Sequence, residues 1–208
     1  MKKLLLALII AVAAPVFAGT HYFTDGIIPD GMEFSIGYVD IDDDGWLDIY
    51  FIPMRLEAPI ADNMTLFGEF QYNDYDYEST FSIGGGAMIR LIEDGQTLPF
   101  NVSLRGALFY GFEKKEDDFT LIPSIFSFEG RAIISKQFDH AVNWTPYANL
   151  VFSHSKATYD FWGEKGSKSE SYLDFVFGVK LRFDQFGIFA EGVFGDQDAF
   201  GIGGSFAF

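Results

Sequence analysis

Apolar and polar side chains alternate along most of the chain beyond residue 32. Between residues 172 and 184, Leu173, Phe175 and Phe177 occupy one parity, while Asp174 and Lys180 occupy the other. Successive side chains of a β-strand point to opposite faces, so this pattern predicts strands with one apolar and one mixed face. It predicts ten strands, at residues 33–41, 46–57, 64–74, 80–92, 99–112, 121–136, 145–158, 171–184, 186–195 and 199–208. Eight strands is the alternative count.

The second of these segments departs from strict alternation. Pro53 lies inside it, and a proline cannot donate a ladder hydrogen bond. The apolar residues also move from odd to even positions near this proline. A β-bulge at residues 51–53 would account for both features.

The first eighteen residues have a different character. Lys2 and Lys3 precede an apolar run, which Pro15 ends shortly before Ala18. The run is too short for a membrane-spanning helix, and it has the form of a secretory signal peptide cleaved after Ala18. We therefore assign residues 1–18 to a signal peptide and 19–208 to a single β domain. No later segment is long and apolar enough to span a bilayer as a helix.

Alternation alone does not say whether the apolar face lines a core or meets lipid. A soluble lipocalin-like barrel and a membrane barrel share this period. The mixed face here is rich in small residues, whereas a soluble exterior normally carries many more charges. Tyrosine and tryptophan gather toward strand ends, which is typical of interfacial aromatic girdles. The pattern therefore favours an all-β fold, a transmembrane antiparallel up-and-down β-barrel.

The last strand carries a further signal. Phe200, Ile202, Gly204, Phe206 and Phe208 share its apolar parity, and the final residue is a phenylalanine. With the signal peptide and the amphipathic strands, this ending resembles small bacterial outer-membrane β-barrel proteins, of the OmpX and OmpW kind. Those barrels have eight strands, so the resemblance covers architecture and not the strand number.

The resemblance implies a cellular setting. The terminal pattern would be the assembly signal read by the barrel-assembly machinery. The protein would lie in the bacterial outer membrane with both termini periplasmic, in contact with outer-membrane lipid and lipopolysaccharide. A monomer is the expected state.

Charge adds a second pattern. The chain has 30 acidic and 14 basic residues and a net charge of −16, which argues against nucleic-acid binding. It has no cysteine, so disulfides and thiolate metal sites are excluded. More than half of the acidic residues fall in the five connections that would face outward, near 40–45, 73–79, 113–120, 159–171 and 195–199. These connections are expected either to meet lipopolysaccharide through bridging divalent cations or simply to be solvated loops.

The first of these connections resembles a calcium loop. Asp40, Asp42 and Asp44 alternate before Gly45, and Asp48 follows three residues later. Alternating carboxylates with a glycine at the turn suit Ca²⁺, and the Trp46 carbonyl would be a further ligand. The bidentate glutamate of an EF-hand is missing, so the alternative is an acidic surface loop. No other cofactor is expected.

The mixed face predicts a network of charges inside the barrel. Its members would be Glu69, Arg90, Arg105, Glu129, Arg131, Asp174, Lys180, Arg182 and Glu191. Buried charges must pair, and small barrels are normally filled by side chains. We expect a structural or surface protein with a filled lumen, and a narrow channel for small or hydrophobic solutes is the alternative.

Catalysis has little support in the sequence. His154 lies between Ser153 and Ser155 near a strand end, but no motif of an outer-membrane enzyme can be matched. We expect no enzymatic activity. The remaining alternative is an enzyme whose site lies at the outer rim of the barrel and acts on lipid or peptide.

Overall fold

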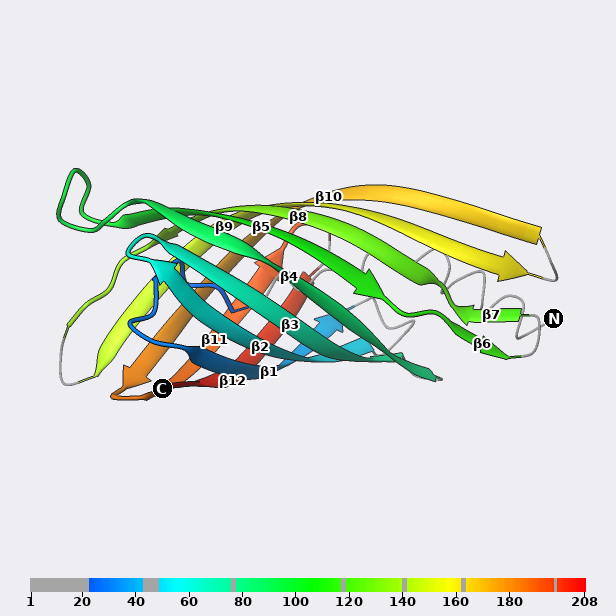
Figure 1. Cartoon of the computed structure of the whole chain (residues 1–208), viewed down its shortest axis with the longest axis horizontal. Coiled ribbons are helices and arrows are strands. Elements are labelled where there is room, and N and C mark those ends of the chain that lie inside the picture. Colours follow the sequence, from blue (N-terminus) through cyan, green and yellow to red (C-terminus); the bar gives the residue numbers. More distant parts are fainter. Residues whose placement is uncertain are drawn as a thin grey trace.

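The computed structural model describes residues 23–42, 49–75, 78–116, 119–139, 142–161, 164–196 and 198–208. The assigned signal peptide lies outside these residues. Within them, no helix is long and apolar enough to span a membrane. The described chain is built from strands, which Figure 1 shows as one elongated barrel.

Twelve labelled strands make up the sheet of the described residues. Their bounds are β1 (Glu33–Asp42), β2 (Ile49–Ala61), β3 (Met64–Tyr75), β4 (Glu78–Ile92), β5 (Asn101–Gly111), β6 (Lys114–Glu116), β7 (Phe119–Ile122), β8 (Ser124–Ser135), β9 (Asn143–Phe161), β10 (Glu164–Phe183), β11 (Phe186–Phe194) and β12 (Asp198–Ala207).

These strands form a closed ring with ten positions. We call each position a stave, and two of the staves are made of two strands each. Strand β5 pairs with β8, and β6 pairs with β7, so β5 with β6 and β7 with β8 each act as one interrupted stave. Each stave is antiparallel to its neighbour. The ring closes where β1 pairs with β12, from Glu33↔Ala207 to Asp42↔Asp198. The predicted ten-stranded up-and-down barrel is confirmed.

The longest strands differ most from their predicted bounds. Strands β9 and β10 pair continuously from Arg182↔Asn143 to Glu164↔Phe161, although the sequence predicts their shared loop to begin near residue 159. A strand needs only about 9–11 residues to cross a bilayer, so this hairpin extends well beyond that length. Figure 1 shows it extending past most of the other strands, toward the end of the barrel where β6 and β7 also lie. Both of its faces are polar there, and alternation of hydrophobicity therefore gave no signal.

The predicted bulge at residues 51–53 is wrong. Strand β2 keeps one register with β3 from Ile49↔Tyr75 to Pro59↔Thr65, and the shift comes later, between Pro59 and Ala61. Odd positions of β2 are buried from Ile49 to Arg55, and Pro53 is one of them. The parity change arises because Ile49 and Phe51 are apolar residues that point into the lumen.

Burial along each stave reverses the usual arrangement of a soluble protein. In β5 and β8, buried and exposed residues alternate almost without exception. Glu129 is 0% exposed, whereas Phe177 on the outer face is 55% exposed. Large apolar side chains therefore cover the outside, and many polar and charged ones lie inside. An exterior of this kind requires lipid around it.

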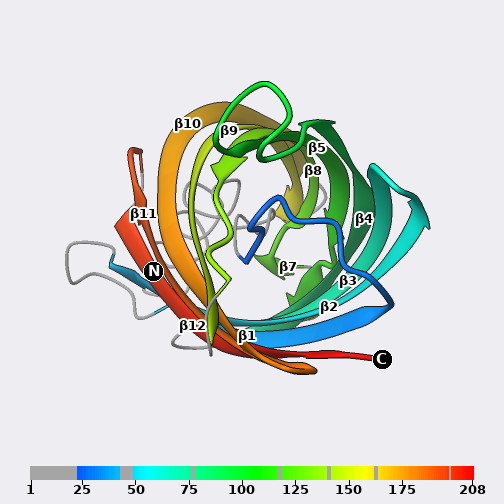
Figure 2. The same cartoon turned by 90° about the vertical axis from the view of Figure 1, so that its left-hand side faces the viewer.

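A segment before the first strand runs inside the ring. Figure 2 looks along the barrel and shows this stretch, drawn in blue, within the circle of strands. We call residues 23–31 the inserted segment. It ends at Met32, whose backbone N–H donates to the Phe208 carbonyl at 3.1 Å and whose carbonyl accepts from the Phe208 N–H at 2.9 Å. We call this end of the barrel, where β1 begins and β12 ends, the turn end.

Candidate functional site in the barrel lumen

Five buried ionic residues from four neighbouring strands meet in the middle of the lumen. This central charge cluster consists of Arg55 on β2, Glu69 on β3, Arg105 on β5, and Glu129 and Arg131 on β8. Two of the arginines form close ion pairs, Arg55 Nη2 with Glu69 Oε2 at 2.7 Å and Arg105 Nη1 with Glu129 Oε1 at 2.6 Å. On the strand ladder, Arg55 is directly opposite Glu69, whereas Arg105 is directly opposite Arg131. Glu129, two residues before Arg131 on the same face of β8, pairs with both of these arginines and offsets their like charges.

Aromatic and longer ionic contacts join these pairs. Arg105 Nη2 lies 4.0 Å from Glu69 Oε2, and Arg131 Nη2 lies 3.4 Å from Glu129 Oε1. The guanidinium groups of Arg105 and Arg55 also lie over the Phe67 ring, at 4.0 and 5.4 Å from its centroid. A cation above an aromatic face is attracted to it, and the attraction grows when water is excluded. The cluster is therefore a packed unit.

Some buried donors and one buried acceptor of the cluster have no hydrogen-bond partner among the described residues. The Nε, Nη1 and Nη2 atoms of Arg131 have no hydrogen-bond partner within the described part of the chain. The same holds for Nε and Nη2 of Arg105 and for Oε1 of Glu69. Buried polar atoms normally find partners, so these atoms mark polar space that water can fill.

A second ionic group lies near the turn end. We call it the rim cluster, and it contains Asp25, Glu33, Lys180 and Arg182. Glu33 accepts from Arg182 Nη2 at 2.5 Å and from Lys180 Nζ, which also lies 3.5 Å from Asp25 Oδ2. Glu33 is 5% exposed, so this group is shielded from water although it lies at the start of β1. It links the barrel wall to the inserted segment.

Wall side chains hold the backbone of the inserted segment from four directions. Arg55 Nη1 donates to the Phe23 carbonyl at 3.0 Å and to Thr24 Oγ1 at 2.9 Å. The Phe23 N–H donates to both carboxylate oxygens of Glu191 at 2.9 Å. Asn149 Nδ2 donates to the Thr24 carbonyl at 3.3 Å, and Ser103 Oγ donates to the Gly26 carbonyl at 2.8 Å. Strands β2, β5, β9 and β11 thus each supply one polar side chain that binds the segment.

The ring of Phe23 occupies a recess lined by glycine. A Cβ atom at Gly37 on β1 would overlap this ring, and one at Gly201 on β12 would lie 3.0 Å from it. Phe189 on β11 lies on another side, with ring centroids 4.0 Å apart. The backbone must approach Phe23 closely here, which only glycine allows.

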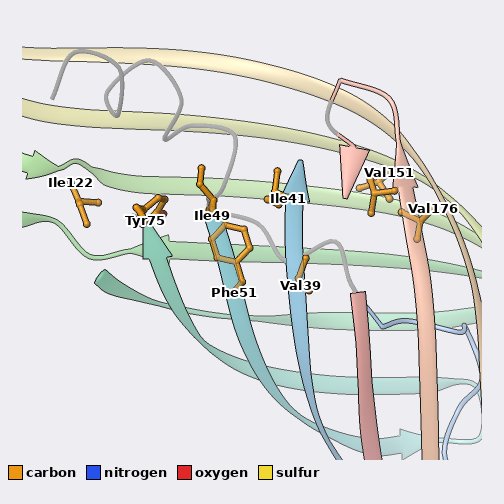
Figure 3. Packing of buried hydrophobic residues seen from close by; sticks show 9 residues of the cluster. Val39, Ile41, Ile49, Phe51, Tyr75, Ile122, Val151 and Val176 are labelled. Carbon is orange, nitrogen blue, oxygen red and sulfur yellow. The ribbon is translucent and has the colours of Figure 1, made fainter. Parts of the chain in front are cut away.

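Beyond Phe23 a group of apolar side chains packs together in the lumen, beside buried polar residues such as Asn73 and Asp174. Its buried members, the apolar layer, are Val39, Ile41, Ile49, Phe51, Tyr75, Ile122, Val151, Val176 and Val193, with Phe23 and Ala199 packed against them. Figure 3 shows eight of these side chains labelled, coming from several strands of the wall. Tyr75 belongs to this layer and is 3% exposed, so the interfacial girdle predicted for tyrosines near strand ends does not include Tyr75.

The charges predicted for the lumen therefore fall into separate groups. Glu69, Arg105, Glu129 and Arg131 meet in the central charge cluster, and Lys180 and Arg182 belong to the rim cluster. Glu191 instead binds the inserted segment and accepts from the Tyr147 hydroxyl at 2.7 Å. Asp174 Oδ1 accepts the Asp196 N–H at 3.1 Å, away from these groups.

One predicted member lies apart from both clusters. Arg90 keeps the inward parity of β4, because it is opposite the buried Ser103, and its side chain is 18% exposed. It pairs with Glu93 at 3.1 Å, and its Nη2 donates to the Asp62 carbonyl at 3.1 Å.

Sequence reasoning missed Arg55, Glu33 and the whole inserted segment. Arg55 and Glu33 lie on the inward parity of their strands. The supposed bulge concealed the parity of Arg55, and extending alternation through Pro53 would have revealed it. The inserted segment has no alternation at all and could not be found by this signal.

The predicted calcium loop lies largely outside the described residues. Asp44, Trp46 and Asp48 are among those not described, and Asp42 is described only as part of β1. Asp40 is exposed and shares the outward parity of Tyr38. Within the described ranges, no group of three or more acidic or histidine side chains could hold a metal ion. Calcium binding therefore stays a prediction.

The terminal strand is placed as its pattern requires. Phe200, Ile202 and Phe208 are 56%, 48% and 59% exposed on the outer face, and Phe206 lies beside them at ring-centroid distances of 6.0 Å from Phe208 and 5.0 Å from Phe186. Gly204 pairs with Ile36 of β1. Recognition of this strand by an assembly machinery stays a prediction.

The serines beside His154 do not form a site with it. Ser153 and Ser155 are buried in the lumen, whereas His154 is exposed on the outer face. His154 Nδ1 lies 2.8 Å from Ser171 Oγ across the β9–β10 ladder. The strand thus separates residues that are adjacent in sequence.

Comparison with known proteins places the fold. No protein-family model matches the chain, and no curated protein sequence matches it. A solved structure, a bacterial polysaccharide outer membrane secretin, is similar with a TM-score of 0.50 and 9% identity, over 87% of this chain. The chain spans 66% of the length of that structure.

Two further solved structures are similar at lower scores. The translocator domain of autotransporter NalP from Neisseria meningitidis has a TM-score of 0.47 and 13% identity, over 88% of this chain and 91% of that one. KdgM porin in complex with disordered oligogalacturonate has a TM-score of 0.44 and 12% identity, over 84% and 99%. At such identities a likeness concerns the fold alone. By its closed ring and its lipid-facing exterior, the chain has the fold of an outer-membrane β-barrel.

Proposed function

We propose that the protein is an integral outer-membrane β-barrel with a structural or surface role and a closed lumen. The observation that carries this proposal is the inverted polarity of the wall, with phenylalanine outside and paired charges inside. Transmembrane β-barrels need an apolar outer band and tolerate a polar interior. The proposal includes contact with outer-membrane lipid and lipopolysaccharide, periplasmic termini and a monomeric state.

Membrane insertion can be tested directly. The protein should fractionate with the outer membrane, float with phospholipid vesicles and migrate differently on SDS gels before and after boiling. Its exposed apolar band leaves no other stable environment for the folded ring. A monodisperse protein recovered without detergent would contradict the proposal and favour a lipocalin-like barrel.

Occupation of the lumen supports a closed barrel. The central charge cluster, the inserted segment and the apolar layer together occupy the lumen, and Arg55 of the cluster binds the inserted segment directly. We therefore expect the wild-type protein to conduct little current in planar bilayers. A large and stable wild-type conductance would favour the alternative function, a narrow channel for small or hydrophobic solutes.

We also propose that the terminal strand directs assembly. Deleting Phe208 removes both backbone hydrogen bonds to Met32 and the last outward aromatic ring of β12. The fraction of heat-modifiable protein in the outer membrane should fall. Phe186→Leu serves as the matched control, because Phe186 on β11 is also an outward aromatic residue and is 62% exposed. Equal assembly of both variants would contradict this role.

The proposal assigns no catalytic activity. Among the residues that the structure describes, a close histidine–serine contact occurs at His154, on the exposed outer face of the β9–β10 hairpin. A screen with lipid A and with peptides, run with a His154→Gln control, tests the low-weight alternative of a rim enzyme. Turnover that depends on His154 would support that alternative instead.

A further inference from the structure

We propose that the inserted segment is a displaceable plug, and that the barrel conducts small hydrated ions when residues 23–31 leave the lumen. This inference rests on the proposed function, because it requires a membrane-spanning barrel. It adds an activity that the closed structure conceals. The argument comes from how the segment is held, how its recess is built and where it is hinged.

The inserted segment is held differently from every strand. Each stave of the wall is fixed by backbone ladders to two neighbours. The described contacts of residues 23–26 with the wall instead pass through side chains, those of Arg55, Ser103, Asn149, Lys180 and Glu191. Water can replace each of these contacts when the segment withdraws, so the segment can leave without breaking the ring.

The recess for Phe23 shows that the seated position is specific. Gly37 and Gly201 leave space for one ring, and Phe189 packs against it. A lumen filled only by random collapse of a leading segment would not need glycines on two strands at one level. The ring also caps the apolar layer, so its departure opens that layer toward the turn end.

The segment has a natural hinge beside the C-terminus. The paired hydrogen bonds between Met32 and Phe208 fix the start of the wall. Gly31 precedes Met32, and a Cβ atom there would lie 2.8 Å from the Phe208 carbonyl oxygen. Rotation near Gly31 therefore moves residues 23–30 while β1 stays paired.

Buried charged groups in the lumen favour a water path after withdrawal of the segment. Arg105 and Arg131 already present buried N–H groups without partners in the described chain. Loss of the segment also frees Glu191 from the Phe23 N–H and Arg55 Nη1 from the Phe23 carbonyl. These charged groups would be hydrated in the open state, which suits the passage of small ions.

Two variants test the plug in the full-length protein. Gly37→Ala places a methyl group where the Phe23 ring lies and should unseat it without touching the ladder of β1. Gly106→Ala is the matched control, because a Cβ atom at Gly106 meets nothing within 4 Å. A chain lacking residues 23–30 removes the plug altogether. Each variant is first checked for heat-modifiable migration and vesicle flotation.

Two readouts follow displacement. In planar bilayers with potassium chloride, wild type and Gly106→Ala should be nearly silent, whereas the deleted chain should show discrete steps and Gly37→Ala about tenfold more open time than wild type. The natural chain has no cysteine, so a single Thr24→Cys substitution reports access to the 3%-exposed Thr24 site. A membrane-impermeant thiol reagent should modify it about tenfold faster in the Gly37→Ala background. Thr97→Cys in an exposed turn gives the rate of full access.

The possible failures are distinguishable. If wild type does not float with vesicles, the proposed membrane function fails, whatever the plug does. If the deleted chain floats, is heat-modifiable and is still as silent as wild type, the plug inference is overturned. Thiol modification of Thr24→Cys in wild type at the Thr97→Cys rate would also overturn it, because the segment would then not be seated.

Discussion

The central charge cluster and the inserted segment fill neighbouring parts of one lumen by different means. The cluster is made of side chains from strands whose backbones are fixed by ladders on both sides. The inserted segment is a stretch of backbone that contacts the wall mainly through wall side chains. The central charge cluster therefore contributes to the stability of the barrel. The inserted segment fills part of the lumen, but the barrel can stay folded without it. Variants of each should therefore change different observables.

The largest effect is expected inside the central charge cluster. Glu129→Ala removes the partner of both Arg105 and Arg131 and leaves two buried cations with less compensation. Breaking a buried pair in this way costs about 3–5 kcal/mol. The free energy of unfolding, measured with urea in detergent micelles, should fall by this amount. Glu93→Ala, at an exposed position near the turn end, should change it little, and similar losses for both would contradict the cluster's role.

Arg55 belongs to both regions and should show an intermediate effect. Its Nε and Nη2 atoms hold Glu69, while Nη1 holds Phe23 and Thr24. Arg55→Lys keeps the charge but loses the planar fork, so it cannot bind both sides at once. We expect a loss of about 1.5–3 kcal/mol in unfolding free energy together with faster labelling at Thr24→Cys. If only the unfolding free energy or only the labelling rate changes, Arg55 acts in the central charge cluster alone or on the inserted segment alone.

Phe23→Ala should have a smaller effect on stability than on occupancy. The ring contributes to seating the inserted segment, and the ladder of the wall does not depend on it. We expect at most about 1–2 kcal/mol in global unfolding, since local opening costs less than unfolding the whole barrel. Thiol labelling of Thr24→Cys in this background should rise clearly. A loss as large as that of Glu129→Ala would remove the distinction between the two regions.

The smallest effect is expected at the projecting surface. Lys114 pairs with Glu78 at 2.6 Å, but their side chains are 44% and 33% exposed. Exposed ion pairs contribute little, so Lys114→Ala should change the unfolding free energy by less than about 0.5 kcal/mol. A larger loss in the same urea titration would mean that the loop end contributes to barrel stability.

The sequence predicted the strands of the barrel wall better than the groups that fill the lumen. Period-two alternation placed ten staves, and it failed where apolar residues point inward, as at Ile49 and Phe51, or where both faces are polar, as in the outer half of β9 and β10. Inward charges such as Glu69 and Glu129 were identified by parity. Their partners were identified only in part, because pairing depends on register between strands far apart in sequence. Residues 23–31 carry no period, and only tertiary contacts reveal where they lie.

Phe23 lies against both sides of the seam that closes the ring. Gly37 belongs to the first strand and Gly201 to the last, and these two strands are joined by the most distant pairing in the sequence. Pairing such distant segments is slow, because the entropy of closing a long loop is lost before the strand contacts form. The recess for Phe23 does not exist until that pairing is complete. The Phe23 ring can therefore bind in its recess only after β1 and β12 have paired. A seated inserted segment thus identifies molecules whose barrel is closed.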